Sequence, residues 1–232
     1  MFLKSTLNSL VALTLALPAS AAPYNYATSD SELSTSAKIK LADSYTDRYK
    51  ILSDDSDFVF DFATTQEQVV TSANFPALTG IGASISMGQL PACSMVFLHL
   101  HPRATELFAL NSGRVVNEMV PEVGAMTPDG KQRVIRTELH PGMVTVFPAG
   151  SFHTQVNPDC EPANFTAAFT SEEFAVGLVA PGLFSFSDGV IERSFGGSIA
   201  GEDIEKVRGA LPASMAIEVE ECLAKCHMAK RH

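Results

Sequence analysis

The feature that most constrains the fold is a series of short apolar runs between residues 58 and 187. The runs are rich in Val, Phe and Thr, and turn sequences containing Gly, Pro and Asn-Ser-Gly separate them. This pattern predicts many short antiparallel strands that close as a sandwich or a jelly-roll barrel. The predicted strands are 94–100, 106–110, 133–139, 143–147, 165–170 and 174–179. Tight turns are predicted at 111–113 and 128–130.

The segment before the predicted barrel, residues 22–57, has a different composition. It is rich in Ser, Thr and Asp, and we interpret it as an N-terminal arm. Apolar residues recur in it every four positions, which is the spacing of one amphipathic helix. These residues are Leu33, Ala37, Leu41, Tyr45 and Tyr49.

The segment after the predicted barrel, residues 188–232, is expected to be helical. Ile204, Val207 and Leu211 form one apolar stripe, and Pro212 is predicted to open a second helix. The second helix would carry Ile217, Val219, Leu223 and Cys226. Such helices pack either on a neighbouring subunit or as a lid on the protein's own sheet, and the sequence leaves both open.

The first 21 residues have the features of a secretory signal peptide. Lys4 gives a positive start, residues 10–17 form an apolar run, and the small residues at 19–21 suit cleavage after Ala21. The apolar run is too short to span a bilayer, although a short membrane anchor is the alternative. We therefore expect a secreted protein of the extracellular space or cell wall.

Length and charge narrow the classes of partner. About 210 residues remain after cleavage, which is enough for one core without a second domain. Lys4 is the only charge removed, so the net charge falls from -10 to -11. A negative chain repels nucleic acid and anionic membranes, and we expect neither as a partner.

Four cysteines lie beyond the signal peptide, and an even number in an oxidising compartment predicts disulfides. Of the three pairings, we favour Cys93–Cys160 and Cys222–Cys226. The second pair is four residues apart on a predicted helix, about 6 Å between Cα atoms, near the long end of disulfide geometry. A metal cluster of Cys222, Cys226 and His227 is the alternative, but it has too few ligands for a closed site.

Two of the six histidines, His99 and His101, end the strand-like run at 94–100. Residues i and i+2 of a strand point to the same face, so both imidazoles should project into one space. Met95 and Phe97 should share this face, while Leu98 should point into a second apolar layer.

A carboxylate and a third histidine are predicted to join this pair. Glu106 opens the next strand, and its inward position among Phe108 and Leu110 is unfavourable unless the carboxylate is paired or metal-bound. His153 begins a strand after a Pro/Gly turn. Three imidazoles and one carboxylate accept manganese, iron, nickel, copper or zinc, and leave positions open for water or substrate. The predicted pocket lining is Met95, Val96, Phe97, Phe108 and Leu110.

The combined spacing is much more specific than any single residue. A lone His-x-His pair is commoner by chance than as a ligand pair, and a lone strand histidine usually belongs to a core. Here H-x-H-x4-E-x6-G, ending at Gly113, precedes G-x5-P-x-G-x2-H-x3-N, which begins at Gly142. Together these two segments predict one metal site on His99, His101 and Glu106 with His153.

The two segments resemble the two motifs of the cupin family, and residues 99–106 are similar to the same stretch in germins and spherulins. The resemblance covers residues 58 to 225. It implies an all-β cupin jelly-roll β-barrel with an N-terminal arm and C-terminal helices. It also implies that His99, His101, Glu106 and His153 bind a metal, most often manganese, and that the C-terminal helices mediate a homo-oligomer.

Two positions depart from the family pattern. Cys93 stands where the first motif opens with glycine, and a Cys93–Cys160 bridge would replace that turn. Val96 stands where germin oxalate oxidases have an asparagine that can hydrogen-bond oxalate. Valine cannot form that bond, and no inward Arg or Lys replaces it; we expect Arg103 to form a salt bridge at the rim.

The remaining polar features receive smaller roles. Asn164-Phe165-Thr166 is the only N-glycosylation sequon, so one glycan on Asn164 is expected. His140 is predicted to be a surface turn residue, and His227 and His232 lie in the tail. None of the three histidines is given a catalytic role.

Two functions from different classes fit these observations. One is a redox enzyme, such as a superoxide dismutase-like protein or a small-molecule oxidase, since metal-centred electron transfer needs no dedicated acid or base. The other is a non-catalytic metal-binding, structural or storage protein of the cell surface. The predicted pocket is apolar and small, so it could hold a small-molecule substrate or ligand beside the metal, or nothing.

Overall fold

The computed structural model describes residues 32–65 and 68–230, and residues 34–232 form one compact unit. The predicted signal peptide over residues 1–21 lies outside the described residues. Among the helices that are described, none has the length and apolar character required to cross a bilayer. The boundaries placed at 57/58 and 187/188 stay a prediction.

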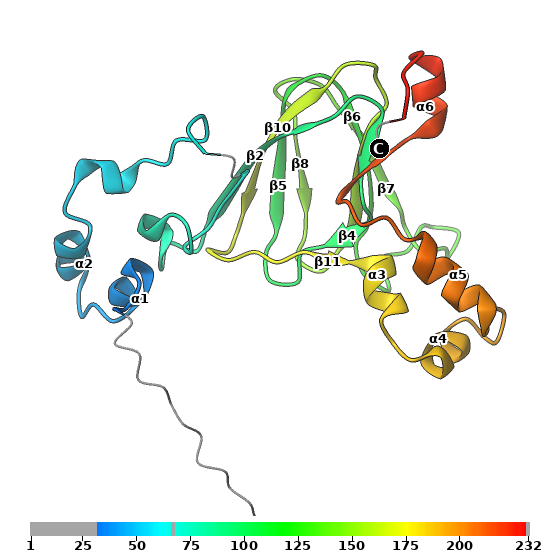
Figure 1. The fold of residues 1–232 in the computed structure, drawn as a ribbon, viewed down its shortest axis with the longest axis horizontal. Coiled ribbons are helices and arrows are strands. Elements are labelled where there is room, and N and C mark those ends of the chain that lie inside the picture. The colour runs from blue at the N-terminus through cyan, green and yellow to red at the C-terminus, as the bar shows by residue number, and fades with distance from the viewer. Residues whose placement is uncertain (1–31, 66–67, 231–232) are drawn as a thin grey trace, which may run out of the picture. The chain divides into compact units, whose positions relative to one another are not determined.

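One sheet contains five antiparallel strands in the order β1-β2-β10-β5-β8 (Figure 1). Their bounds are β1 Val69–Val70, β2 Ser84–Leu90, β5 Glu106–Ser112, β8 Val144–Phe147 and β10 Ala163–Phe169. Side chains of β5 alternate, with Glu106, Phe108 and Leu110 buried and Leu107 exposed. This alternation confirms the inward positions predicted for that strand.

The second sheet is built around β9, which lies between β6 and a strand made of two pieces, β3 and β4. Outside them, β7 pairs with β6, β12 with β3 and β11 with β4. The bounds are β3 Ser94–Val96, β4 His99–Leu100, β6 Val115–Val120, β7 Ile135–Leu139, β9 Phe152–Asn157, β11 Gly177–Leu178 and β12 Ala216–Glu218. The fold is therefore the predicted all-β, jelly-roll-like barrel with minor helices.

The main core lies between the two sheets and is made of inward-facing residues from both. Its members are Leu90, Ala104, Phe108, Leu110, Val115, Met119, Leu139, Phe147, Ala163, Ala167 and Phe169. Burying the Val, Leu, Met and Phe side chains among them stabilises a fold by roughly 1.5–3 kcal/mol each. The predicted turns are also present, since Gly113 and Gly130 both have positive φ, a conformation that glycine adopts without strain.

The strand predicted at 94–100 is interrupted at Phe97 and Leu98. The Phe97 N–H donates to the Met215 carbonyl (2.7 Å), and the Leu98 carbonyl accepts from the Val179 N–H (3.1 Å). Leu98 is 40% exposed, so its predicted place in a second apolar layer is wrong. The break shifts the inward–outward alternation of side chains by one residue. Val96 and His99, which are three residues apart, therefore line the same cavity.

The single helix predicted in the N-terminal arm is wrong. Two short helices replace it, α1 Thr35–Lys40 and α2 Tyr45–Ile51, each with a serine side chain, Ser34 or Ser44, accepting from a first-turn N–H. An N-cap residue has a non-helical backbone, so Ser44, the N-cap of α2, separates α2 from α1. The buried residue of α1 is Ile39, and most of the predicted stripe is exposed. Two short 3-10 helices follow, at Asp55–Phe58 and Pro76–Leu78.

The C-terminal part contains four helices, and the prediction for it is only partly correct. They are α3 Val179–Phe184, α4 Asp188–Ser194, α5 Glu202–Ala210 and α6 Glu220–Lys225. Ile204 of α5 packs with Phe184 and Ile191 in a separate apolar cluster. The helix predicted from Pro212 is wrong over 216–218, because these residues form β12 on the edge of β3 and gain its backbone hydrogen bonds. Of the strand predicted at 174–179, only residues 177–178 form a strand, and α3 begins at Val179.

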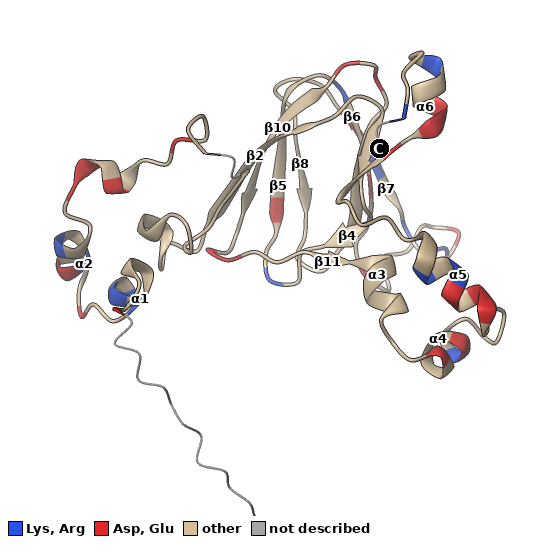
Figure 2. Cartoon of the chain, viewed as in Figure 1, with Lys and Arg blue, Asp and Glu red and all other residues tan. Residues whose placement is uncertain are grey.

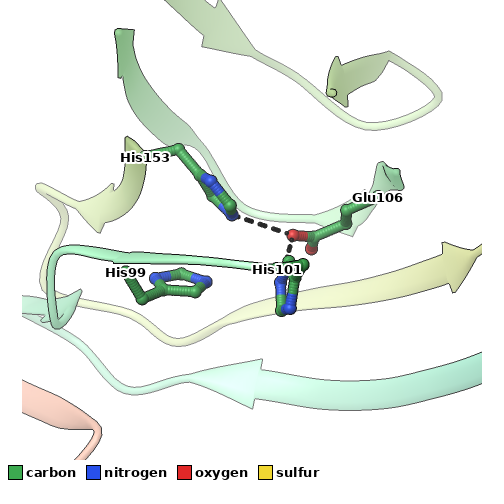
Figure 3. Close-up of side chains that lie close together, drawn as sticks. All are labelled: His99, His101, Glu106 and His153. Atoms are coloured by element: carbon green, nitrogen blue, oxygen red, sulfur yellow. Dashed lines mark hydrogen bonds and ion pairs between the residues drawn. The ribbon is translucent and has the colours of Figure 1, made fainter. Parts of the chain in front are cut away.

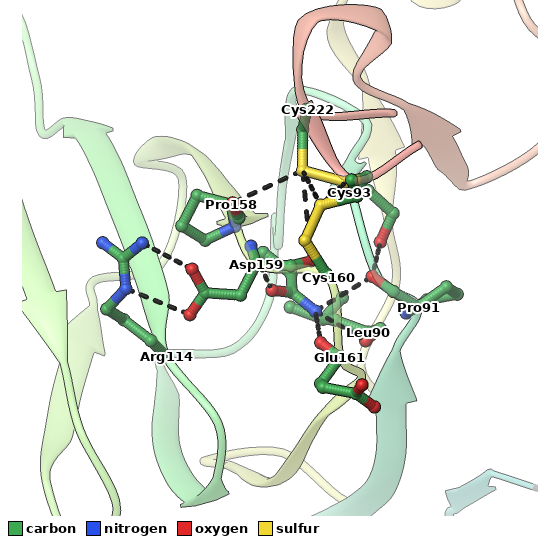
Figure 4. The surroundings of a disulfide bond; sticks show 12 residues. Leu90, Pro91, Cys93, Arg114, Pro158, Asp159, Cys160, Glu161 and Cys222 are labelled. Atoms are coloured by element: carbon green, nitrogen blue, oxygen red, sulfur yellow. Dashed lines mark hydrogen bonds and ion pairs between the residues drawn. A yellow bond between two sulfur atoms is a disulfide. The ribbon is translucent and has the colours of Figure 1, made fainter. Parts of the chain in front are cut away.

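The favoured disulfide pairing is also wrong. The bonds are Cys93–Cys222 (Figure 4) and Cys160–Cys226. Their Cα separations are 5.2 and 5.4 Å. The Val219 N–H donates to the Cys93 carbonyl (2.8 Å) and places α6 against this end of the barrel. Cysteines one turn apart on a helix face the same way, so each reaches a different barrel cysteine. No described cysteine is free, which excludes the alternative cysteine metal site.

Candidate metal centre

Four buried polar side chains from both sheets meet inside the barrel. His99 lies on β4 opposite His153 of β9, His101 follows β4, and Glu106 begins β5. Each of the four is at most 4% exposed, and one donor atom from each lies within 4.8 Å of the others (Figure 3). Glu106 is the one charged residue of β5, visible as the red segment of that strand (Figure 2).

Backbone carbonyl groups hold all three imidazoles by their Nδ1 atoms. The His99 Nδ1 bonds to the Phe97 carbonyl (2.8 Å), and the His101 Nδ1 to the Ala175 carbonyl (2.8 Å). The His153 Nδ1 bonds to the Ser151 carbonyl (2.9 Å). A carbonyl oxygen can only accept, so each Nδ1 must carry the proton, and in the neutral ring each Nε2 is left with a lone pair.

These tautomers leave lone pairs facing a carboxylate. The Nε2 atoms of His101 and His153 each lie 3.1 Å from the same Glu106 oxygen, Oε2. Two acceptors attract one another only through a cation, which is either a proton on the ring or a metal ion. Donors about 2.0–2.2 Å from an ion at right angles lie roughly 3 Å apart, so the spacing fits adjacent ligands of one metal. The group therefore fits a metal cofactor.

Electrostatics at the site favour the protonation states that bind metal. Burial, followed by the nearby His153, lowers the pKa of His99 to about 4, which keeps that imidazole neutral. Burial alone would raise the pKa of Glu106, but in the metal-free protein a proton on the Nε2 of His101 or His153 can lie between ring and carboxylate, and these hydrogen bonds outweigh burial and lower the pKa to about 2. The carboxylate is thus ionised at every physiological pH.

Aromatic rings hold His101 and His153 in place. Phe147 stacks on His153 with ring centroids 4.2 Å apart and planes 10° from parallel. Phe169 and Phe174 stack on each other, and both meet the His101 ring edge-on. Such packing restricts ring rotation, so the histidines are preorganised before any ion binds.

A cavity of about 250 Å3 adjoins His99, His101 and Glu106. Of the predicted lining residues, Val96 and Phe108 line it. Met95, Phe97 and Leu110 are not among its lining residues; Met95 lies on β3, Phe97 in the break that follows it, and Leu110 in the main core. Lining residues that the sequence analysis missed include Leu90, Gln155, Phe165, Phe169, Phe174, Met215 and Ala216.

Other predicted residues lie away from this centre. His140 is exposed and pairs with Glu138 (3.3 Å), as expected of a surface residue. Arg103 is exposed and forms no ion pair with any described residue, so the predicted salt bridge is absent. Asn164 is exposed on β10, where its side chain bonds to Ser112 (2.7 Å), and its glycosylation stays a prediction.

The metal-free protein is expected to lose stability as the pH falls from 6.5 to 4. The pKa of His99 is lower in the folded chain, about 4, than in the unfolded chain, 6.5, so unfolded molecules bind the extra proton in this range. The free energy of unfolding has its full value above pH 6.5 and is lower by up to about 3 kcal/mol at pH 4. Urea unfolding with a chelator measures it. His99→Gln should remove most of this pH dependence of the unfolding free energy, while His140→Gln should leave it unchanged. If His99→Gln showed the same pH dependence as the wild type, His99 would not be its cause.

The barrel and its His-His-Glu-His group define a class, the cupins with a metal-type centre. The family comparison agrees, since the Cupin family matches residues 52–201, and the chain belongs to that family. Within it the chain is germin- and spherulin-like. It is 34% identical to spherulin-1A of Physarum polycephalum over 200 residues, 82% of this chain and 78% of the relative.

A plant relative and a solved structure support the same placement. The chain is 35% identical to germin-like protein subfamily 2 member 3 of Arabidopsis thaliana over 150 residues, 62% of this chain and 64% of that one. An oxalate oxidase structure matches with a TM-score of 0.57 and 19% identity, covering 67% of this chain and 81% of the other. At this identity the structure supports the fold alone.

Proposed function

We propose that this chain binds one divalent transition metal ion, manganese in preference to iron, nickel, copper or zinc, on His99, His101, Glu106 and His153. The observation that carries the proposal is the fixed Nδ1–H tautomer of all three histidines, which leaves the Nε2 lone pairs of His101 and His153 facing one carboxylate oxygen, with His99 in the same group. When bound, the ion supplies a Lewis-acidic, redox-active centre with open positions. Manganese is favoured by the germin and spherulin likeness.

We further propose that the centre performs redox chemistry on a small molecule. Among the described residues lining the cavity, the titratable ones are His99, His101 and Glu106, and all three are assigned to the metal. No residue is left there for general acid–base catalysis, which disfavours decarboxylation and hydrolysis. The chain's own contribution is to orient the ligands and to exclude water with the aromatic walls.

A non-catalytic role in metal binding, storage or wall structure is the second candidate. The same absence of a free acid or base favours it. Superoxide dismutation and oxalate consumption, assayed together with elemental analysis, separate the two functions. We expect superoxide activity in the wild type and in His140→Ala, and at least a tenfold loss in His101→Ala. Equal activity in all three proteins would exclude the enzyme and leave the structural role.

The setting of the protein is part of the proposal. Two disulfides suit an oxidising compartment, which supports secretion to the extracellular space or wall. A homo-oligomer is supported by exposed apolar side chains on neighbouring strands, where Leu107 of β5 is the register partner of Val146 of β8 and Val144 lies nearby. Light scattering of the purified protein measures the oligomeric state.

A further inference from the structure

The cavity beside the candidate metal centre is large enough for an organic molecule. Its volume is about 250 Å3, whereas a cavity of about 150 Å3 in another protein holds benzene. The walls are mostly apolar or aromatic. They include Leu90, Val96, Phe108, Phe165, Phe169, Phe174, Val176 and Met215. The preferred occupant is therefore a ring-sized apolar group larger than benzene alone.

Apart from the proposed metal ion, the cavity offers an anion no partner. None of the described residues that line it is Lys or Arg, and Glu106 contributes a negative charge. Val96, which lines the wall with His99, has no hydrogen-bonding group. An anionic group could therefore pair only with the metal ion, so the part of a ligand that lies among the apolar walls should be uncharged.

One buried polar group in the cavity wall lacks a partner. Gln155 is 2% exposed, and its Oε1 makes no hydrogen bond with any described residue. It lies on β9 two residues after His153, so both side chains point to the same face, about 7 Å apart along the strand. A buried acceptor without a donor destabilises a protein, and such groups call for an explanation.

We propose that the cavity binds an uncharged, mostly apolar molecule with one hydroxyl or N–H group, and that Gln155 accepts the hydrogen bond from that group. The inference rests on the proposed metal centre, because it names the ligand class of the same site. The apolar body contacts Phe108 and Phe165, and the opposite end of the molecule faces the metal ligands. Gln155 is a specificity-determining residue in this assignment.

Calorimetric titration of the manganese-loaded protein, under argon to prevent oxidation, tests the assignment. The probes are p-cresol and toluene, which lacks the hydroxyl. We expect p-cresol to bind about tenfold more tightly than toluene, the effect of one hydrogen bond. In Gln155→Leu the ratio of the two affinities should fall to about one. An unchanged ratio in the variant would overturn the inference.

Two further measurements keep the test decisive. Val96→Phe should narrow the cavity and weaken the binding of both aromatic probes at least tenfold without changing the metal content. This variant tests the cavity even if Gln155→Leu does not fold. Gln155→Leu should melt at the same or a higher temperature, because it removes an unpaired polar group. Elemental analysis of the same samples separates the failures: absence of metal refutes the proposed function, whereas a loaded protein without the hydroxyl preference refutes only this inference.

Discussion

Changing Glu106 to Gln is expected to raise the dissociation constant for manganese by at least 100-fold, so that the purified protein retains less than a tenth of an equivalent. Glu106 is the single anionic donor of the group, and its oxygen faces both His101 and His153 at 3.1 Å. Removing residues that merely support ligands costs 10–100-fold in affinity, and a direct anionic ligand should cost more. Elemental analysis and a metal titration measure the loss.

The matched control for this experiment is Glu138→Gln. Glu138 makes the same kind of contact on the surface, with His140 (3.3 Å) and Arg114 (3.5 Å), so the chemical change is identical outside the metal centre. The control should keep full metal content. Excess metal should raise the melting temperature of the wild type and of Glu138→Gln, but not of Glu106→Gln. Retention of a full equivalent by Glu106→Gln would remove Glu106 from the ligand set.

The His-His-Glu-His group could be predicted from sequence because its geometry is local. His99 and His101 share a face two residues apart, Glu106 opens the next strand, and a Pro/Gly turn places His153 at a strand start. Gln155 could have been found in the same way, since it follows His153 by two residues on one strand. The pocket prediction was partly wrong because it assumed one continuous strand over 94–100. The alternation of side chains in the sequence does not reveal the break at Phe97.

The C-terminal part was less predictable because its structure depends on what it packs against. Residues 216–218 have no strong strand preference, and they are extended because β3 offers an open edge. The disulfide pairing has the same origin. Cys222 and Cys226 are close in sequence, but the position of α6 directs each to a distant partner. Contacts made across 66 and 129 residues leave no local signal.

The double variant Cys93→Ala/Cys222→Ala is expected to lower the free energy of unfolding by about 2–5 kcal/mol. This disulfide joins residues 129 apart, and a cross-link that closes a long loop restricts the unfolded chain most. The remaining Cys160–Cys226 bond keeps part of that restriction, so the loss should not exceed the range. Both cysteines must be replaced, because the Cys93 and Cys226 sulfur atoms lie 3.4 Å apart and a free thiol would exchange.

The same variant tests whether the Cys93–Cys222 bond, which ties α6 to the barrel, also affects the candidate metal centre. Loss of the bond loosens the start of α6, whose end Cys160–Cys226 still holds, and weakens β12, so amide hydrogen exchange at 216–218 should accelerate while metal content stays at the wild-type level. Tryptic mapping of the wild type gives the pairing, since cleavage after Lys225 separates Cys222 from Cys226. Recovery of a disulfide-linked Cys93–Cys160 peptide would contradict the Cys93–Cys222 pairing. An unchanged free energy of unfolding in the double variant would contradict its stabilising role. A simultaneous loss of metal would show that β12 and α6 support the ligands, because Met215 and Ala216 line the cavity beside His99.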